Sequence, residues 1–318
     1  MSNEWIDVHA HFTPPMTLEQ SEARWTAMRA ADWTGEKPAD WTVEAALRTM
    51  DNIGVAMQML SNIPKIHDAL RASNDFGASI VSKYPSKFGL LAALPTDDVN
   101  NAIAEIARAD NALNADGFAV TCCYNGVYLS DPRLESMWAE LDRREAVVFA
   151  HPDAYARGIF RRPTAVMETV FETANTIVDM LYTGIFRRYP NFKLVLAHCG
   201  GPLPALSGRL LMLGTEPWVP NPQKLTADEM RKQLAALFLD TAMTGSAHTI
   251  GPALEMTSCD HIVYGSDCGV PCSSDRTAQA NIAALMQVAH LSQEQVQQIG
   301  RNALMLFPNA AKRLTAGG

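Results

Sequence analysis

The chain has 318 residues, of which 47% are hydrophobic and 19% are charged, an ordinary composition for a globular protein. Its net charge is -8 and no run of basic residues occurs, which excludes nucleic acid and anionic membrane surfaces as expected partners. No stretch of about 18 consecutive apolar residues is present, and the first residues lack the pattern of a signal peptide. We therefore expect a cytoplasmic protein, with six free cysteines because their spacing fits no zinc finger.

Eight short apolar runs alternate with segments of helical periodicity. Each run is short and apolar, as expected of a strand that is buried on both faces. The runs cover residues 6–8, 57–60, 88–92, 118–121, 147–150, 194–197, 237–239 and 262–264. The run at 237–239 could equally continue the helix before it. Eight alternations of strand and helix predict one (β/α)8 barrel, a TIM barrel, over residues 1–318.

Two segments carry further structural signals. Leu134, Met137, Trp138 and Leu141 follow the spacing of one helix face, and Asp131 before a proline is typical of a helix start. Residues 12–45 contain three tryptophans but no strand pattern. We predict that they form a segment inserted after the first strand, which covers the mouth of the barrel.

Histidines and acids follow several of the predicted strands. In a barrel of this kind, the residues at the carboxyl ends of the strands converge on one site. His9 and His11 follow the first run, His151 the fifth, His198 the sixth and Asp267 the eighth. Because alternate residues of a strand point the same way, His9 and His11 can both reach one ion. Imidazoles and a carboxylate suit a divalent metal, with zinc as the first expectation and manganese as the alternative.

Each of these residues also has an ordinary structural explanation. A lone H-x-H pair is weak evidence, His198 could be a hydrogen-bonded core residue, and Asp267 could cap a helix. Their coincidence at the ends of strands one, five, six and eight favours a shared metal site. Asp240 follows the seventh run, and we expect Asp7 to face the barrel wall or to hold a backbone group.

The order of these motifs resembles a known family. The chain resembles the amidohydrolase superfamily in the order of four motifs: H-x-H, H-P, H-C-G-G and G-S-D. Within that superfamily it is most similar to the branch that contains aminocarboxymuconate semialdehyde decarboxylase and 6-methylsalicylate decarboxylase. The similarity covers nearly the whole chain and includes residues 50–55, 84–89, 126–129 and 197–201. It implies the same barrel fold and a dimeric assembly, for which residues 12–45 offer apolar surface.

The resemblance also implies roles for individual residues. The implied metal ligands are His9, His11, His151 and Asp267. His198 would stay off the metal and act on a metal-bound water, and Arg48 would bind the carboxylate of the substrate.

The number of metal ions follows from a missing lysine. Binuclear members of the superfamily bridge two ions with a carboxylated lysine at the end of strand four. Here that strand ends at Thr121-Cys122-Cys123, and no lysine occurs between Lys87 and Lys193. We therefore expect one metal ion.

Two kinds of chemistry remain open at this point. The first is non-oxidative decarboxylation of a small aromatic or unsaturated carboxylic acid, with His198 or Asp267 supplying the proton. The residues 126–129 and Trp138 favour this reading. The second is hydrolysis of a lactone, amide or carbon–carbon bond by a metal-bound water. A binding protein without turnover is a third, weaker interpretation.

Overall fold

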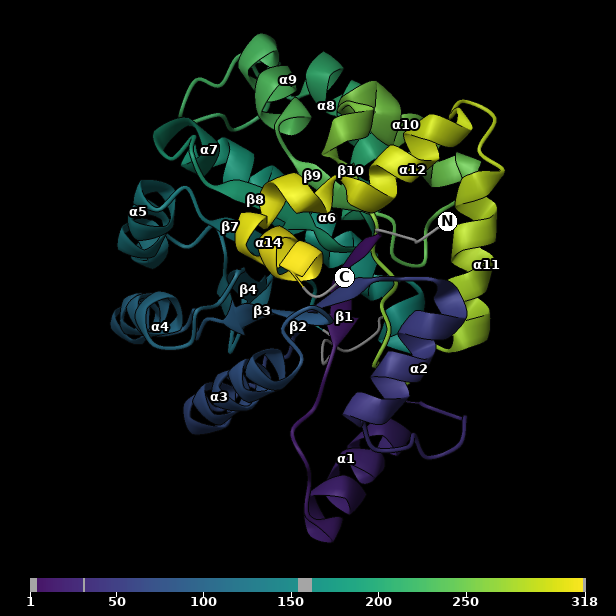
Figure 1. Cartoon of the computed structure of the whole chain (residues 1–318). Coiled ribbons are helices and arrows are strands. Elements are labelled where there is room, and N and C mark those ends of the chain that lie inside the picture. Colours follow the sequence, from purple (N-terminus) through teal and green to yellow (C-terminus); the bar gives the residue numbers. More distant parts are fainter. Residues whose placement is uncertain (1–4, 31, 154–161, 317–318) are drawn as a thin grey trace.

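Eight parallel strands form a barrel that is surrounded by helices (Figure 1). The computed structural model describes residues 5–30, 32–153 and 162–316. In spatial order the strands are β1 (Ile6–His11), β2 (Met57–Ser61), β3 (Phe88–Ala93), β4 (Gly117–Thr121), β7 (Val147–His151), β8 (Lys193–Leu196), β9 (Phe238–Asp240) and β10 (Ile262–Val263). All eight predicted strands are confirmed, including the ambiguous run at 237–239. Strands β5 (Cys123–Tyr124) and β6 (Val127–Tyr128) form a separate hairpin after β4.

The first and last strands close the barrel. The amide of Val8 donates to the carbonyl of Tyr264 at 3.0 Å, and the amide of His11 donates to the carbonyl of Cys268 at 2.7 Å. Gly269 permits this approach: its φ is +90°, and a Cβ there would lie 2.0 Å from the carbonyl oxygen of His11. Only glycine combines that backbone angle with that space.

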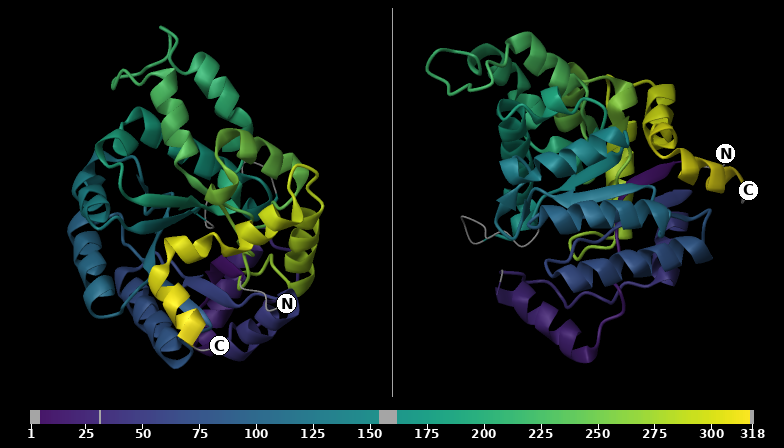
Figure 2. Two further views of the ribbon diagram at one scale, coloured as in Figure 1. Left: turned by 45° about the horizontal axis from the view of Figure 1, so that its top comes forward. Right: turned by 90° about the vertical axis from the view of Figure 1, so that its left-hand side faces the viewer.

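Most of the helices cover the outside of the barrel, as the two views of Figure 2 show. The longer helices are α1 (Leu18–Ala30), α2 (Val43–Ile53), α3 (His67–Lys83), α4 (Val99–Asn111), α5 (Glu135–Arg143), α6 (Glu168–Tyr182), α8 (Leu203–Leu213), α9 (Ala227–Ala235), α10 (Ala247–Met256), α11 (Asp275–Met286), α12 (Gln293–Arg301) and α14 (Pro308–Ala316). The shorter ones are α7 (Ile185–Arg188), α13 (Ala303–Leu306), η1 (Pro132–Leu134), η2 (Thr164–Val166), η3 (Ala197–Gly200) and η4 (Cys259–His261). The expected helix start at Asp131 is confirmed, because its side chain accepts from the amide of Arg133 at 2.9 Å.

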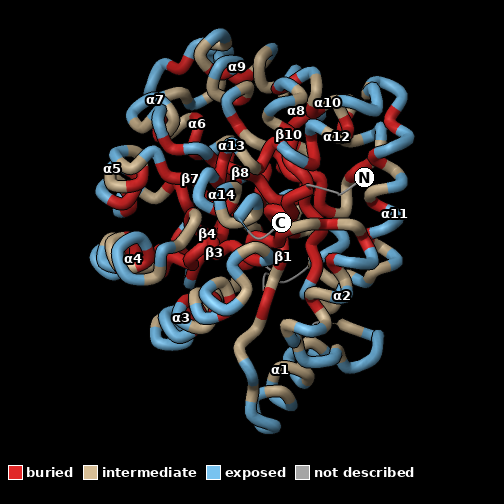
Figure 3. The backbone as a smooth tube through the Cα atoms, in the orientation of Figure 1, coloured by how far each residue is buried: buried red, intermediate tan, exposed pale blue. Residues whose placement is uncertain are grey.

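Buried residues concentrate on the strands and on the inward faces of the helices (Figure 3). Inside the barrel, Val8, Met59 and Phe149 pack with Leu306 and Phe307, which come from the C-terminal helical region. This apolar filling occupies the interior below the carboxyl ends of the strands. Inside the barrel, this leaves the space at the carboxyl ends of the strands for polar side chains.

The segment between β1 and α2 differs from the expected cover. Helix α1 extends from the side of the barrel in Figures 1 and 2, and none of its residues is buried. Its sequence carries no apolar stripe that could pack across the mouth, and Leu18 at its start is exposed. Among the described residues, no helix is both long and apolar enough to cross a membrane.

Candidate metal centre

An irregularity in β1 aims two histidines into the barrel. Ile6 and Val8 belong to the apolar interior, so simple alternation would turn His9 outward. The register of β1 against β2 shifts between Asp7 and Ala10, as it does at a β-bulge. A bulge re-aims the side chains that follow it. His9 and His11 therefore both reach the interior above Ile6 and Val8.

Three donor atoms form a compact triangle at this end of the barrel. Nε2 of His9 lies 3.0 Å from Nε2 of His11 and 3.1 Å from Oδ1 of Asp267. Nε2 of His11 lies 3.2 Å from the same carboxylate oxygen. Donors bound to one zinc ion at about 2.0–2.1 Å with tetrahedral angles stand roughly this far apart. The spacing and the chemistry of the donors thus fit one divalent ion.

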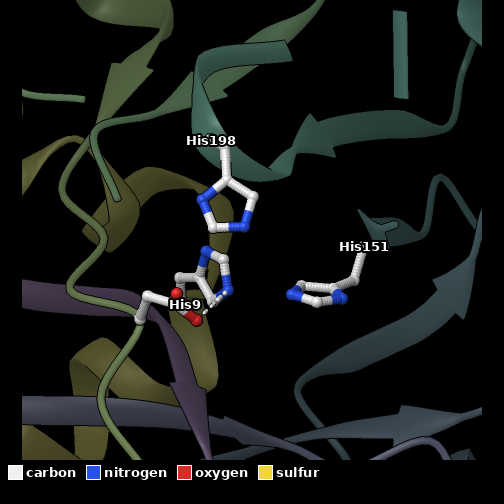
Figure 4. Close-up of side chains that lie close together, drawn as sticks. His9, His151 and His198 are labelled. Atoms are coloured by element: carbon white, nitrogen blue, oxygen red, sulfur yellow. Dashed lines mark ion pairs between the residues drawn. The ribbon is translucent and has the colours of Figure 1, made fainter. Parts of the chain in front are cut away.

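His151 at the end of β7 and His198 in η3, directly after β8, complete the group. Figure 4 shows their rings beside His9. One potential ligand atom from each of His9, His151, His198 and Asp267 lies within 4.8 Å of the others. The ring of His11 is 4.8 Å from that of His151, measured between centroids. All five residues expected at the strand ends are brought together, and either His11 or His198 can be the fourth ligand.

Backbone carbonyls orient the two outer histidines. Nδ1 of His151 lies 2.8 Å from the carbonyl oxygen of Pro152, and Nδ1 of His198 lies 3.2 Å from that of Ala242. A carbonyl can only accept, so each Nδ1 carries the proton in these bonds. Nε2 of each ring is then the atom available for a metal or a proton.

Asp240 pairs with the ring nitrogen of His9 that faces away from the metal site, a role that the sequence analysis missed. Its Oδ2 lies 2.6 Å from Nδ1 of His9, and both side chains are fully buried. Its Oδ1 accepts from the amide of Ala242 at 3.0 Å. Metal-binding histidines commonly pair their second nitrogen with a carboxylate in this way. The available signal was its position directly after the seventh strand.

Asp7 holds the site together without facing it. Its Oδ1 accepts from the amides of His9 at 3.1 Å and Ser266 at 2.9 Å. Its Oδ2 accepts from Oγ of Ser266 at 2.5 Å and from Nε2 of Gln58 at 3.0 Å. The expectation that Asp7 holds backbone groups is confirmed. Burial raises its pKa to about 6, although these hydrogen bonds oppose the shift.

Burial and mutual charge set the protonation of the cluster. Burial lowers the pKa of His151 well below its usual value, and the neighbouring His11 and His9 add to that effect. Burial raises the pKa of Asp267, but the histidines His9 and His11 outweigh it and hold that pKa well below the usual range. Burial also opposes the charged form of His9, yet Asp240 and Asp267 raise its pKa to about 10. A neutral His151 and an ionised Asp267 are the forms that bind metals.

Unusual backbone angles occur at three residues of the site. His198, Cys199 and Asp267 have φ values of 53°, 57° and 59°, in the left-handed region. Residues other than glycine adopt this region at a cost, and such residues gather at functional sites. The amide of Asp267 donates to the carbonyl of His9 at 2.9 Å, which fixes its position against β1.

Arg48 lies away from this cluster. It is on α2, whose buried residues are Ala46, Met50 and Ile53, and it is exposed. At about 100° per residue, position 48 falls on the opposite side of the helix from position 46. Arg48 is thus on the exposed side of α2, and its role in binding the carboxylate of the substrate stays a prediction.

Comparisons with known proteins agree with this geometry. The family model described as Amidohydrolase matches residues 6–308. The chain is 28% identical over 321 residues to 6-methylsalicylic acid decarboxylase from Penicillium expansum, a match that covers 95% of this chain and 96% of that protein. It is 28% identical over 236 residues to gamma-resorcylate decarboxylase from Rhodococcus jostii, covering 64% of this chain and 70% of the other.

Solved structures share the fold. A dihydroxybenzoic acid decarboxylase from a Polaromonas species, with bound manganese and the inhibitor 2-nitroresorcinol, superposes with a TM-score of 0.76 at 22% identity, covering 98% of this chain and 99% of that one. A 2,6-dihydroxybenzoate decarboxylase in complex with 2,6-dihydroxybenzoate gives a TM-score of 0.76 at 21% identity, covering 96% and 99%. With a family model that matches nearly its whole length and a buried His/Asp centre at the mouth of the barrel, this chain belongs to the amidohydrolase family.

Proposed function

We propose that this protein is a metal-dependent, non-oxidative decarboxylase of small aromatic carboxylic acids. The observation that carries the proposal is the buried cluster of three or four histidines and Asp267 at the mouth of the barrel. Support comes from relatives of similar length that are named as decarboxylases of aromatic acids.

The reaction breaks the bond between the carboxyl carbon and the ring. The electron pair of that bond stays on the ring carbon, which takes up a proton as carbon dioxide leaves. A divalent ion held by His9, His11, His151 and Asp267 would act as a Lewis acid that stabilises the negative charge developing on the substrate. The ring carbon also needs a proton, which a side chain beside the metal centre can deliver.

His198 fits that requirement best. Its Nδ1 is fixed by the carbonyl of Ala242 at 3.2 Å, so Nε2 can hold the proton and transfer it to the ring carbon. The side chain is buried and its ring lies 5.0 Å from that of His9, measured between centroids. Asp267 is the second candidate for this step, but as an ionised ligand it carries no proton to give.

We further propose zinc as the resident ion. Imidazole-rich sites of this kind suit zinc, although a solved relative contains manganese. Metal content after expression in medium that supplies both ions, followed by activity of protein reloaded with each ion alone, separates the two.

The remaining proposals concern the molecule as a whole. We propose a single barrel domain with an insertion at residues 12–45, a homodimer, and a cytoplasmic location. Exposed Leu18 and the half-buried Trp25 and Trp33 support an interface on the insertion. Sedimentation of the wild-type protein and of a variant with Leu18 and Trp25 replaced by serine tests the dimer.

The decisive experiment measures carbon dioxide release from a panel of salicylate-type acids by metal-loaded protein. A lactone panel is assayed beside it. Turnover of at least one hydroxylated benzoate, abolished in the His198→Ala variant, is the expected result. Lactone hydrolysis without any carbon dioxide release would overturn the proposal in favour of hydrolysis by a metal-bound water.

A further inference from the structure

A buried asparagine on an outer helix fastens the loop that follows β9. Helix α11 lies on the outside of the barrel (Figure 1), and Asn281 on its buried face is 7% exposed. Its Nδ2 donates to the carbonyl of Thr241 at 2.8 Å, and its Oδ1 accepts from the amide of Gly245 at 2.7 Å. One side chain therefore holds both ends of the segment 241–245.

The backbone of this segment needs that support. Met243, in its middle, has a φ of 56°, in the left-handed region. A residue other than glycine keeps such an angle only where its surroundings hold it there. The two bonds of Asn281 fall two residues before and two residues after Met243. A Cβ on Gly245 would lie 2.7 Å from Oδ1 of Asn281, so the segment also packs directly against α11.

The segment presents both backbone groups of Ala242 to the metal centre. The carbonyl oxygen of Ala242 lies 3.2 Å from Nδ1 of His198, and its amide donates to Oδ1 of Asp240 at 3.0 Å. Thr241, whose carbonyl Asn281 holds, is the residue directly before Ala242. The group that orients the ring of His198 is thus fixed from α11, outside the barrel.

We propose that Asn281 is a positioning residue for the proton donor His198. This inference rests on the proposed function, because it supposes that His198 transfers a proton to the substrate. The bonds of Asn281 keep the carbonyl of Ala242 where it accepts from Nδ1 of His198, which leaves Nε2 as the atom that transfers the proton. Without them the segment can shift, the ring of His198 can turn, and proton transfer slows.

The chain offers a matched control at the opposite end of β10. Asn302 is 4% exposed, and its Nδ2 donates to the carbonyls of Cys259 at 2.8 Å and Ile262 at 2.7 Å. It is also a buried asparagine that holds backbone carbonyls, but at the amino end of the strand. Loss of either side-chain amide leaves buried backbone groups unpaired, which destabilises the protein by a similar amount. An asparagine with a purely structural role at position 281 would behave like Asn302.

Heteronuclear NMR of the zinc-loaded protein with isotope-labelled histidines tests the geometry without turnover. The Nδ1–H group of His198 gives a signal that the His198→Ala variant assigns. Asn281→Ala should shift or broaden this signal. The signal of His151 should stay unchanged, because the carbonyl of Pro152 holds its Nδ1. Asn302→Ala should leave both signals unchanged.

Steady-state kinetics with a hydroxylated benzoate test the consequence. Asn281→Ala should lower kcat about tenfold or more, change KM less than about twofold and retain one equivalent of metal. Asn281→Asp keeps the shape of the side chain and the acceptor for Gly245 but lacks the donor to Thr241, so it should also lower kcat. Gly245→Ala displaces the segment from α11 without altering Asn281, and it should give the same pattern. These two variants decide the question if Asn281→Ala does not fold.

Three results would overturn the inference. One is an unchanged His198 signal and an unchanged kcat in the variants of Asn281. Another is equal changes in Tm, kcat and the His198 signal in Asn281→Ala and Asn302→Ala. The third is loss of bound metal in Asn281→Ala, since Asn281 would then act on the metal ligands through Asp240 or through Gly265, whose carbonyl lies 3.4 Å from its Nδ2. Absence of carbon dioxide release by the wild-type protein would count against the proposed function, and the NMR comparison would still decide whether Asn281 positions His198.

Discussion

Oδ2 of Asp240 lies 2.6 Å from Nδ1 of His9, and neither side chain is exposed to solvent. The pair comes from β9 and β1, so the carboxylate fixes the ring of His9 across the barrel. Gly265 stands between them, and a Cβ there would lie 3.0 Å from Cβ of His9 and 3.1 Å from Cβ of Asp240. The pairing orients Nε2 of His9 toward His11 and Asp267.

Asp240→Asn should therefore weaken metal binding. Loss of a carboxylate behind a metal-binding histidine typically costs about 10–100-fold in metal affinity or activity. Competition with a metal-sensitive dye measures the affinity. Asp97→Asn is a matched control, because Asp97 forms a similar pair with His67, 2.7 Å apart, at a partly exposed position away from the centre. Equal losses in both variants would contradict the role of Asp240.

The fourth ligand can be decided by two alanine variants. The donor atoms of His9, His11 and Asp267 lie 3.0–3.2 Å apart, so His11 is the expected fourth ligand. His198 is then free of the metal and is the expected proton donor. His11→Ala should lose bound metal on dialysis. His198→Ala should keep one equivalent and lose about 100-fold or more in kcat, as expected for removal of a general acid. Metal loss in His198→Ala with retention in His11→Ala would assign the opposite roles.

Removal of the metal should lower thermal stability. The donors of the centre are buried or nearly so and gather in one place, and an ion that binds only the folded state stabilises it by mass action. At about 1,000 times the dissociation constant this amounts to about 4 kcal/mol, or an increase in Tm on the order of 10 °C. Scanning calorimetry before and after chelation measures the change. His11→Ala serves as the control, since chelation should alter its Tm much less.

Much of the fold follows from the sequence because strands buried on both faces must be short apolar runs. The ambiguous run at 237–239 is also part of a strand: β9 pairs with β8 and β10, and Asp240 at its end lies beside His9. The site residues follow from the rule that strand ends converge. His9, His11, His151, His198 and Asp267 all obey it.

Other features depend on contacts that no local pattern records. The bulge in β1 changes which residues face inward, and it is seen in the register of β1 against β2. Lys65 contacts Cys123 and Asp153, which follow β4 and β7 and are far from it in the sequence. The direction of Arg48 is a related case: a family motif gave its position in the chain, whereas the helix periodicity of α2 set its direction.

Gly269 links the closure of the barrel to the metal centre, and its replacement should damage both. With φ at +90° and a Cβ that would lie 2.0 Å from the carbonyl oxygen of His11, alanine must displace Gly269 or β1. We expect Gly269→Ala to destabilise the protein by about 3 kcal/mol, from backbone strain and steric overlap, and to weaken metal binding through His11. Thermal unfolding and metal content measure the two effects.

Gly208→Ala provides the control for that prediction. Gly208 lies inside α8 with no atom within 4 Å of the position that a Cβ would occupy. Alanine there should raise the stability by about 0.5–1 kcal/mol, because glycine is a poor helix residue, and it should leave the metal content unchanged. Equal stability and equal metal content in the two variants would mean that the chain after β10 can shift away from β1 without cost. The hydrogen bond between the amide of His11 and the carbonyl of Cys268 would then not be what holds His11 in place.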